Sequence, residues 1–276
     1  MARPLRTVEL FLALGAAATA ALPMAPAGAA SPPGGTGPAA MALSVAQHAG
    51  HGHGGEGGEG GEGGEGAAAV ASSDVDYLAV LGQMRGHLLV AGELLAQGNT
   101  TQAEKHIGHP VEELYGAVDP VLAGRGVAPF RPQLVLLLEL IQADPRAPRT
   151  AAAYGAAVAA VDAAAQGVPA AVRNNPHTTA AVVRALARVA ASEYDAAIAE
   201  GVVVEAIEYQ DSRGFVLYAQ QLLTRALGAG APPEAIRILG PMQPRLAALA
   251  GAWPTLAPPS PLVLTPGMVT ILANQL

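Results

Sequence analysis

Apolar residues recur at helical spacing from about residue 73 onward. Ser73 and Asp74 predict an N-cap, and the apolar stripe that follows extends to about Gln97. Its members are Tyr77, Val80, Leu81, Met84, Leu88, Ala91 and Leu95. Alternation of apolar and polar residues never extends beyond two or three positions, so the pattern predicts an all-α fold.

Glycine and proline divide the rest of the chain into further helices. A turn at 98–100 precedes a second helix capped by Thr100 or Thr101, and His109–Pro110 predicts a kink because proline removes a helix hydrogen bond. Further helices are expected over 111–122, 131–142, 150–166, 178–200, 204–227 and 233–251, with a short one capped by Thr265. We therefore expect a helical bundle of about six to eight helices, in two halves, 73–166 and 167–276.

Residues 1–72 lack this periodicity. Arg3 and Arg6 precede an apolar run over 8–22 that ends in small residues, which predicts a signal peptide over 1–29. Residues 30–72 are rich in Pro, Gly, His and Glu, and predict a disordered linker because they cannot bury enough apolar surface to fold. The protein is thus expected to be exported, most simply to the periplasm, and not to span a membrane after cleavage.

The amino-acid composition excludes several kinds of functional site. The chain has no cysteine, so thiolate nucleophiles, disulfides and thiolate metal sites are excluded. Its formal net charge of −7 disfavours nucleic acid as a partner. A nucleophile elbow, a dinucleotide fingerprint and a phosphate-binding loop are all missing from the sequence, so we expect no enzyme.

Candidate metal ligands lie on the first two predicted helices. Met84 and His87 share one helix face, and His106, His109 and Glu113 share a face of the next helix. In an antiparallel hairpin about Gly98, His87 and His109 would lie at similar height. Imidazoles and carboxylates on facing helices are how bundles bind first-row metals, which predicts a metal site from these five residues. A histidine buried and paired for structural reasons remains the alternative.

A second, weaker candidate is acidic. Glu200, Glu205, Glu208 and Tyr209 belong to a cluster over 193–211 that also contains Glu193, Tyr194, Asp195 and Asp211. Such groups bind hard cations, although a solvated helix surface has the same composition. The leader offers His48, His51 and His53 before four Gly-Gly-Glu repeats, which predicts a spacer that captures cations weakly.

The stretch EYDAAIAEGVVVEAIEYQ resembles the soluble extracytoplasmic helical region of bacterial high-affinity iron permeases, where the pattern runs much like YxxAVxDGxVxxxxEY. The matching positions are Tyr194, Glu200, Gly201, Val202, Val204, Glu208 and Tyr209. The first half, with GQMRGHLLVAGELL and HIGHPVEELY, resembles small exported His/Glu-rich helical proteins associated with iron uptake. The chain departs from the permeases because Glu205-Ala-Ile-Glu208 lacks a preceding arginine and no membrane helix is expected.

The resemblance implies an accessory role rather than transport by this chain. We expect a periplasmic metal-binding protein in iron uptake, which holds a divalent or ferric transition-metal ion, iron favoured, and whose partner is an inner-membrane iron permease. The alternative is a helical interaction module for a membrane or envelope partner, without metal. A metal-dependent oxidation, for instance of ferrous iron, is the third hypothesis.

Overall fold

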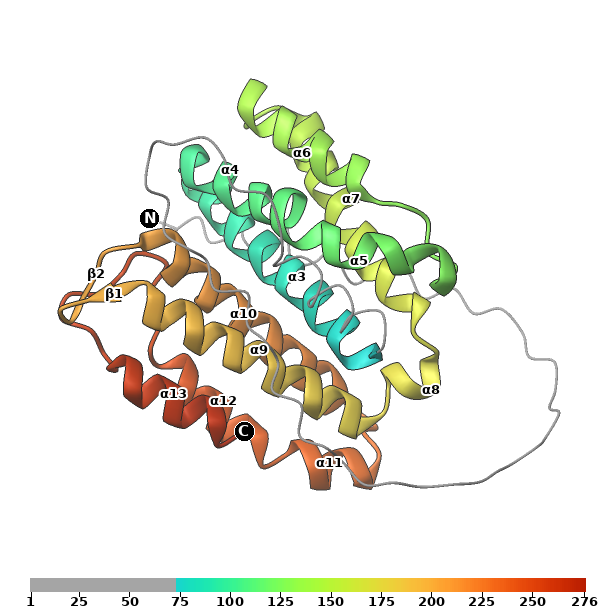
Figure 1. The fold of residues 1–276 in the computed structure, drawn as a ribbon, viewed down its shortest axis with the longest axis vertical. Coiled ribbons are helices and arrows are strands. Elements are labelled where there is room, and N and C mark those ends of the chain that lie inside the picture. The colour runs from blue at the N-terminus through green and yellow to red at the C-terminus, as the bar shows by residue number, and fades with distance from the viewer. Residues whose placement is uncertain (1–72) are drawn as a thin grey trace, which may run out of the picture.

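The computed structural model describes residues 73–276, and the all-α class is confirmed for this part of the chain (Figure 1). The signal peptide expected over 1–29 and the linker expected over 30–72 lie outside the described residues. The first half contains α3 (Asp74–Gln97), α4 (Thr100–His109), η1 (Pro110–Leu114), α5 (Tyr115–Leu122), η2 (Ala123–Arg125), α6 (Arg131–Ala143), α7 (Pro148–Ala164) and η3 (Ala165–Gly167). The second contains α8 (Ala170–Arg173), α9 (Pro176–Ala196), β1 (Ile198–Ala199), β2 (Val202–Val203), α10 (Ala206–Ala226), α11 (Pro233–Leu239), α12 (Met242–Ala250) and α13 (Pro266–Asn274).

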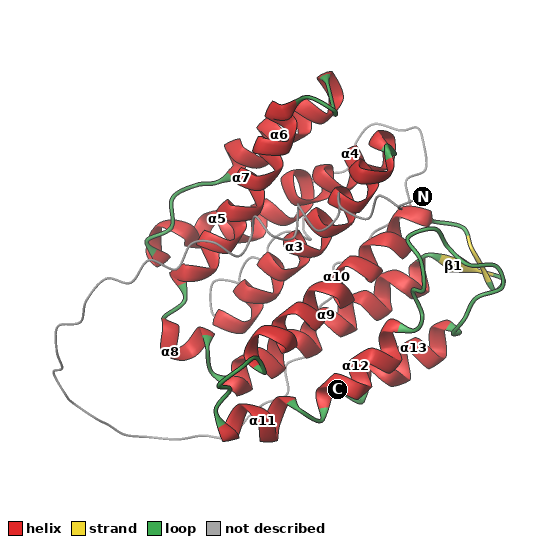
Figure 2. Cartoon of the chain, turned by 180° about the vertical axis from the view of Figure 1, so that it is seen from behind, coloured by secondary structure: helices red, strands yellow, loops and turns green. Residues whose placement is uncertain are grey.

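Helix α3 runs through the middle of the molecule. It packs against α4 and α7 on one side and against α9 and α10 on the other, and α11 to α13 form the outer layer of the second half (Figures 1 and 2). None of the described helices is long and apolar enough to cross a membrane. Helix α3 therefore joins the two halves, because one of its faces contacts helices of the first half and the other contacts helices of the second.

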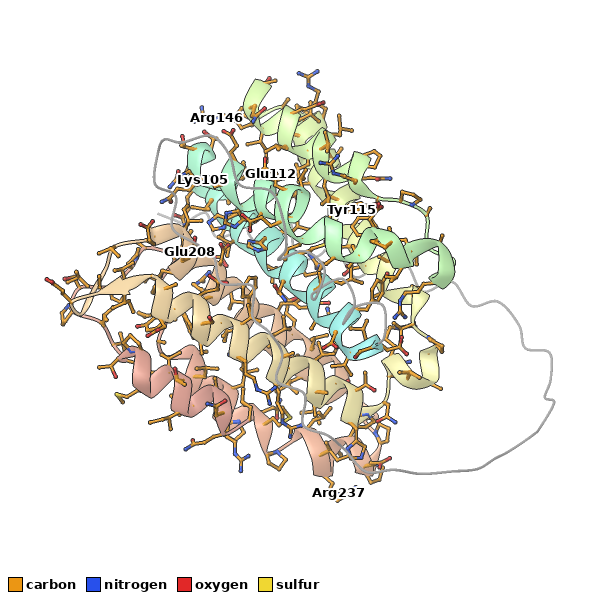
Figure 3. All side chains as sticks on the ribbon, viewed as in Figure 1. Lys105, Glu112, Tyr115, Arg146, Glu208 and Arg237 are labelled. Atoms are coloured by element: carbon orange, nitrogen blue, oxygen red, sulfur yellow. The ribbon has the colours of Figure 1, made fainter. Side chains whose placement is uncertain are left out.

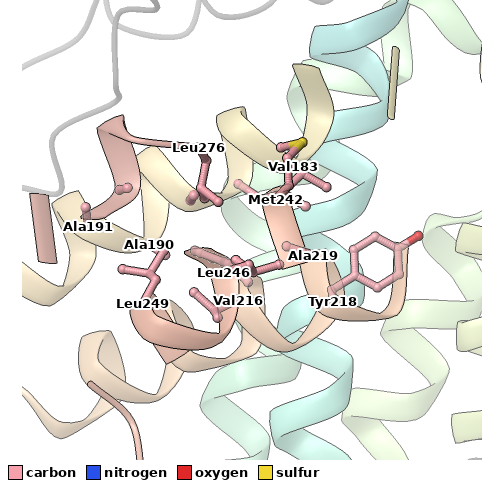
Figure 4. Close-up of a cluster of buried hydrophobic side chains, with 14 of the residues drawn as sticks. Val183, Ala190, Ala191, Val216, Tyr218, Ala219, Met242, Leu246, Leu249 and Leu276 are labelled. Carbon is pink, nitrogen blue, oxygen red and sulfur yellow. The ribbon is translucent and has the colours of Figure 1, made fainter. Parts of the chain in front are cut away.

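Buried apolar side chains form one large cluster in each half. The first cluster extends along the chain from Tyr77 to Val168, and the second from Ala180 to Leu276. In the second, Ala190 of α9 and Val216 of α10 meet Leu246 and Leu249 of α12 (Figure 4). The boundaries of the two halves remain a prediction.

Two helix caps agree with the sequence prediction. Ser73 Oγ accepts a hydrogen bond from Asp76 N, and the Thr265 side chain accepts one from Met268 N. The second helix, however, is capped by Asn99, whose side chain accepts from Gln102 N, so the assignment to Thr100 or Thr101 is wrong. Asn is as good a cap as Ser or Thr, and the turn places it one residue earlier.

The expected kink at His109–Pro110 takes the form of a π-helical segment, η1, between α4 and α5. Tyr115 N donates to Pro110 O across this wider turn. The proline ring and its missing N–H disturb the regular hydrogen-bond ladder, and one wide turn lets the chain continue without ending the helix.

The helix predicted over 178–200 was too long. It ends at Ala196, and a short antiparallel hairpin pairs Ile198 with Val203 and Ala199 with Val202. Glu200 and Gly201 form its two-residue loop with φ of 53° and 78°. Positive φ at both positions defines a type I′ turn, whose twist suits a hairpin. The helix predicted over 233–251 is likewise divided, into α11 and α12 at Gly240–Pro241.

Candidate metal centre

Two glycines let α3 and α10 cross with their backbones in contact. A Cβ at Gly86 would lie 2.6 Å from Phe215 Cδ1 and 2.9 Å from the carbonyl carbon of Gly214. A Cβ at Gly214 would lie 2.5 Å from Gly86 O. Side chains at either position would force the helices apart. The crossing brings His87, the next residue of α3, close to Asp211, one turn before Gly214 on α10.

Three imidazoles surround the carboxylate of Asp211. Asp211 Oδ1 lies 2.6 Å from His87 Nδ1 and 2.7 Å from His106 Nδ1, and Oδ2 lies 2.9 Å from His109 Nδ1. The rings of His87 and His109 are 5.1 Å apart between centroids and nearly perpendicular. The histidines come from α3 and α4 and the carboxylate from α10, so both halves contribute to the group.

The group is buried. The exposed fractions are 4% for His87, 0% for His106 and 2% for Asp211. Phe215 covers His87 edge-on at 5.1 Å between ring centroids. Charges and polar atoms so far from water require partners, and an apolar wall strengthens whatever electrostatic interaction they make.

Burial and the neighbouring charges shift the pKa values in opposite directions. Burial lowers the pKa of His87 below its usual value despite the nearby carboxylate. Burial also acts to lower the pKa of His109, but the hydrogen bond and charge of Asp211, with the charges of Glu113 and Glu208, raise it to about 9. Burial raises the pKa of Asp211, whereas the charges of His87 and His106 and the hydrogen bonds from the rings bring it well below its ordinary range.

Gln210 sets the orientation of His106. His106 Nε2 lies 2.8 Å from Gln210 Oε1, and the Gln210 amide nitrogen donates to Gln102 Oε1 at 3.2 Å and to Leu256 O at 3.5 Å. The amide oxygen therefore faces the ring and accepts from Nε2–H. Nδ1 of the same ring donates to Asp211 Oδ1 at 2.7 Å, because an ionised carboxylate only accepts, so a metal ion that binds Nδ1 would take the place of this proton.

The donor set fits a transition-metal ion. Ligand atoms of His87, His106 and Asp211 lie within 4.8 Å of one another. Two imidazoles and one carboxylate with open positions are the ligand set of many non-haem Fe(II) sites. His87 Nδ1 is buried and, despite its short distance to Asp211, makes no aligned hydrogen bond. Two ligand atoms that each bind an ion at about 2.1 Å lie roughly 3 Å from each other. Binding of an ion would therefore lengthen the present 2.6 Å distance between His87 Nδ1 and Asp211 Oδ1 by a few tenths of an ångström.

Additional acids lie near the imidazoles. The charges of Glu113 and Glu208 act on His109. Glu208 lies at the end of α10 nearest α4 (Figure 3), and its Oε2 is buried with no hydrogen-bond partner among the described residues. One acidic residue from each half thus adds negative charge beside the three histidines.

The structure places the sequence-predicted site residues as follows. His87, His106 and His109 come together, and Glu113 acts on His109 through its charge. Met84 lies fully buried in the apolar cluster of the first half. His48, His51 and His53 lie outside the described residues.

The four residues of the acidic candidate are dispersed. Glu200 sits in the hairpin loop, Glu205 precedes α10, and Tyr209 donates its hydroxyl to Thr255 O in the second core. Glu208 alone of the four acts on the histidines. Glu193 and Glu200 do not share a helix face, because α9 ends between them at Ala196.

Asp211 was expected only as a member of the acidic cluster and not as a partner of the histidines, and Gln210 was not predicted. One signal pointed to Asp211. It shares a helix face with Gly214, Phe215 and Tyr218, which are buried. A carboxylate on an apolar stripe needs a partner from another element.

Residues 169–276 match the family model of the iron permease-associated four-helix bundle domain. This match confirms the resemblance to the helical region of iron permeases, and it indicates an iron-uptake context for the second half. Neither a curated protein nor a solved structure matches the chain. The matched region supplies Asp211, Gln210 and Glu208, whereas the histidines precede it.

Proposed function

We propose that the protein is an exported, periplasmic metal-binding accessory protein of iron uptake, and that the ion is its cargo. The observation that carries the proposal is the meeting of His87 Nδ1 and His106 Nδ1 at one oxygen of a buried carboxylate, Asp211 Oδ1. Export is supported by the N-terminal pattern and by the match of the second half to an iron permease-associated domain.

The three histidines have two roles in this proposal. His87, His106 and Asp211 bind the ion through Nδ1, Nδ1 and Oδ1, and His109 holds the other carboxylate oxygen, Oδ2. This contact, 2.9 Å between His109 Nδ1 and Asp211 Oδ2, fixes the carboxylate plane, as outer partners do in metal sites. Glu113 and Glu208 add negative charge that offsets the charge of a buried cation.

Iron is the favoured ion. Imidazole and carboxylate ligands suit Fe(II), Zn(II) and Mn(II) alike, so the ligand set defines a first-row ion rather than one element. The iron permease-associated match of residues 169–276 supports iron among these, with an inner-membrane iron permease as the partner.

The test is a metal titration of the protein under anaerobic conditions with Fe(II), Mn(II) and Zn(II), with elemental analysis. We expect one ion per chain, lost in Asp211→Asn and in His87→Ala. His177→Ala, at a histidine whose side chain is 70% exposed, is the matched control and should retain the ion. Replacing His48, His51 and His53 by alanine should remove only weak additional binding. One ion per chain in Asp211→Asn would disprove the proposal.

A helical interaction module without metal is the second candidate. It is favoured by one observation: both ring nitrogens of His106 already have oxygen partners, Asp211 and Gln210. In that case the His–Asp group is a buried polar network that fixes how α3, α4 and α10 pack. The same titration separates the two, since a protein that binds no stoichiometric ion supports the module.

A further inference from the structure

A cleft of about 530 Å³ opens on the face of α3 that carries Arg85. Residues of α3, α7, α9, α10 and α11 line it. Arg85 precedes His87 by two positions, which in a helix places the two side chains on nearly opposite faces. The cleft is thus distinct from the metal centre, and its volume lies within the range of small-molecule sites, about 300–1,000 Å³.

The charged residues of the cleft are mostly cationic. Arg85, Arg173 and Arg225 line it, with Asp162 as the one acidic lining residue. This excess of positive charge occurs in a chain whose formal net charge is −7. Within the described residues, neither Arg173 nor Arg225 forms an ion pair, and Arg173 Nη1 donates to Val168 O. The cleft therefore attracts anions in an otherwise acidic molecule.

Arg85 has unused hydrogen-bonding capacity. Its Nε donates to Asp162 Oδ1 at 2.8 Å, while its Nη1 is buried without a partner among the described residues. The side chain is 8% exposed, so water does not readily replace the missing acceptor. A guanidinium in this state is suited to receive a carboxylate oxygen.

Tyr218 brings two guanidinium groups together. The Arg85 and Arg225 Cζ atoms lie 5.6 Å and 5.3 Å from the centroid of its ring. Cation–π contacts hold both side chains at the cleft but neutralise neither. The remaining lining includes Leu78, Leu81, Val182 and Leu222, which offer an apolar surface beside the two charges.

We infer that this cleft binds a small organic anion, a carboxylate attached to an apolar body. The carboxylate accepts from Arg85 Nη1 and from the guanidinium of Arg225, and the hydrocarbon part lies against Leu78, Leu81 and Leu222. An inorganic anion would leave the apolar lining unused, and an uncharged lipid would leave Arg85 Nη1 without an acceptor.

The test is calorimetric titration of the full chain with octanoate, beside 1-octanol and inorganic phosphate. We expect octanoate to bind one to one and more tightly than either. Arg225→Gln and Arg85→Gln should each weaken octanoate binding roughly tenfold or more, since hydrogen bonds to charged groups are lost. Arg237→Gln, an exposed arginine on α11 outside the cleft, is the matched control and should bind octanoate like the unmodified protein.

Three outcomes would overturn the inference: no octanoate binding, equal binding of octanol or phosphate, or octanoate binding unchanged in Arg225→Gln. Arg225 is exposed, so its variant keeps the test valid even where Arg85→Gln fails to fold. His87→Ala should leave octanoate binding unchanged, which distinguishes this cleft from the metal centre.

Discussion

Asp211 is the residue on which the buried polar group depends, because its two oxygens receive three imidazoles. With metal removed by a chelator, Asp211→Ala should lower the free energy of unfolding by about 3 kcal/mol, since it leaves the rings without their acceptor. Urea unfolding followed by circular dichroism measures this. Asp195→Ala, at an exposed position of α9, is the control and should change stability by less than about 0.5 kcal/mol. Equal midpoints for the two variants would contradict the role of Asp211.

Gln210 orients an imidazole without contacting the proposed ion. Gln210→Ala should weaken metal binding roughly 10- to 100-fold, as is typical when the hydrogen-bond partner of a ligating histidine is removed. Isothermal titration with Fe(II) or Zn(II) measures the change. Gln220→Ala on the same helix is the matched control and should bind metal normally. If both variants bind equally, Gln210 has no positioning role.

At the scale of helices, Gly86 and Gly155 should respond in opposite ways to the same substitution, although both lie within helices. Gly86 lies at the close crossing of α3 and α10, and Gly155 does not. Gly86→Ala should destabilise the protein by about 1–3 kcal/mol, because its Cβ meets Phe215 and the Gly214 backbone. Gly155→Ala within α7 should instead stabilise by about 0.5–1 kcal/mol, since its Cβ meets nothing within 4 Å. Thermal unfolding of both variants gives the sign. A stabilising Gly86→Ala would show that the helices do not cross this closely.

The hairpin loop offers a second prediction of element scale. Glu200 is the one described non-glycine residue with positive φ, and Asn tolerates that conformation better. Glu200→Asn should raise the free energy of unfolding by about 0.5–1 kcal/mol, measured by urea denaturation. Glu234→Asn, on the exposed surface of α11, is the control and should not stabilise. A destabilised Glu200→Asn would mean that the carboxylate of Glu200 makes a needed contact.

The tyrosines and glycine of the iron-permease-like stretch also serve the fold. Tyr194 and Tyr209 donate their hydroxyls to Leu264 O and Thr255 O, and Gly201 completes the type I′ turn. These residues anchor the chain after α12 to α9 and α10. Each of these three residues therefore has a structural role of its own: two side-chain hydrogen bonds and one positive φ.

Helices and their order could be predicted because periodicity and capping are local. The first helix was predicted to within a residue of α3, from its Ser73 cap to Gln97. The end at Ala196 was missed because an Ala-rich stretch continues the helical pattern, and the turn is specified by only two residues, Glu200 and Gly201.

Only the histidines of the candidate site could be predicted from the sequence, for a related reason. His87, His106 and His109 lie on neighbouring helices joined by a short turn, so their meeting follows from an antiparallel hairpin. Asp211 lies 105 residues beyond His106 along the chain. Its approach depends on the crossing at Gly86 and Gly214, a tertiary contact that leaves no periodic signal.

At the scale of the molecule, an ion bound between α3, α4 and α10 would stabilise both halves together. At a free metal concentration a hundred times the Kd, binding should add about 2.7 kcal/mol to the free energy of unfolding. That corresponds to a rise in Tm of about 5–10 °C for a protein of this size. Differential scanning calorimetry with and without chelator checks it, and Asp211→Asn should show no rise. A rise of equal size in that variant would place the ion elsewhere.

The division of the site between two parts of the chain also gives a rule for sorting related sequences. The carboxylate lies within the region that matches the permease-associated domain, and the imidazoles lie in the helices before it. A protein that matches the same family model but carries other residues at the positions of His87 and His106 would keep the carboxylate and lack the two imidazoles. Among such proteins, the capacity to bind this ion should therefore depend on the helices that precede the matched region, and not on the matched region itself.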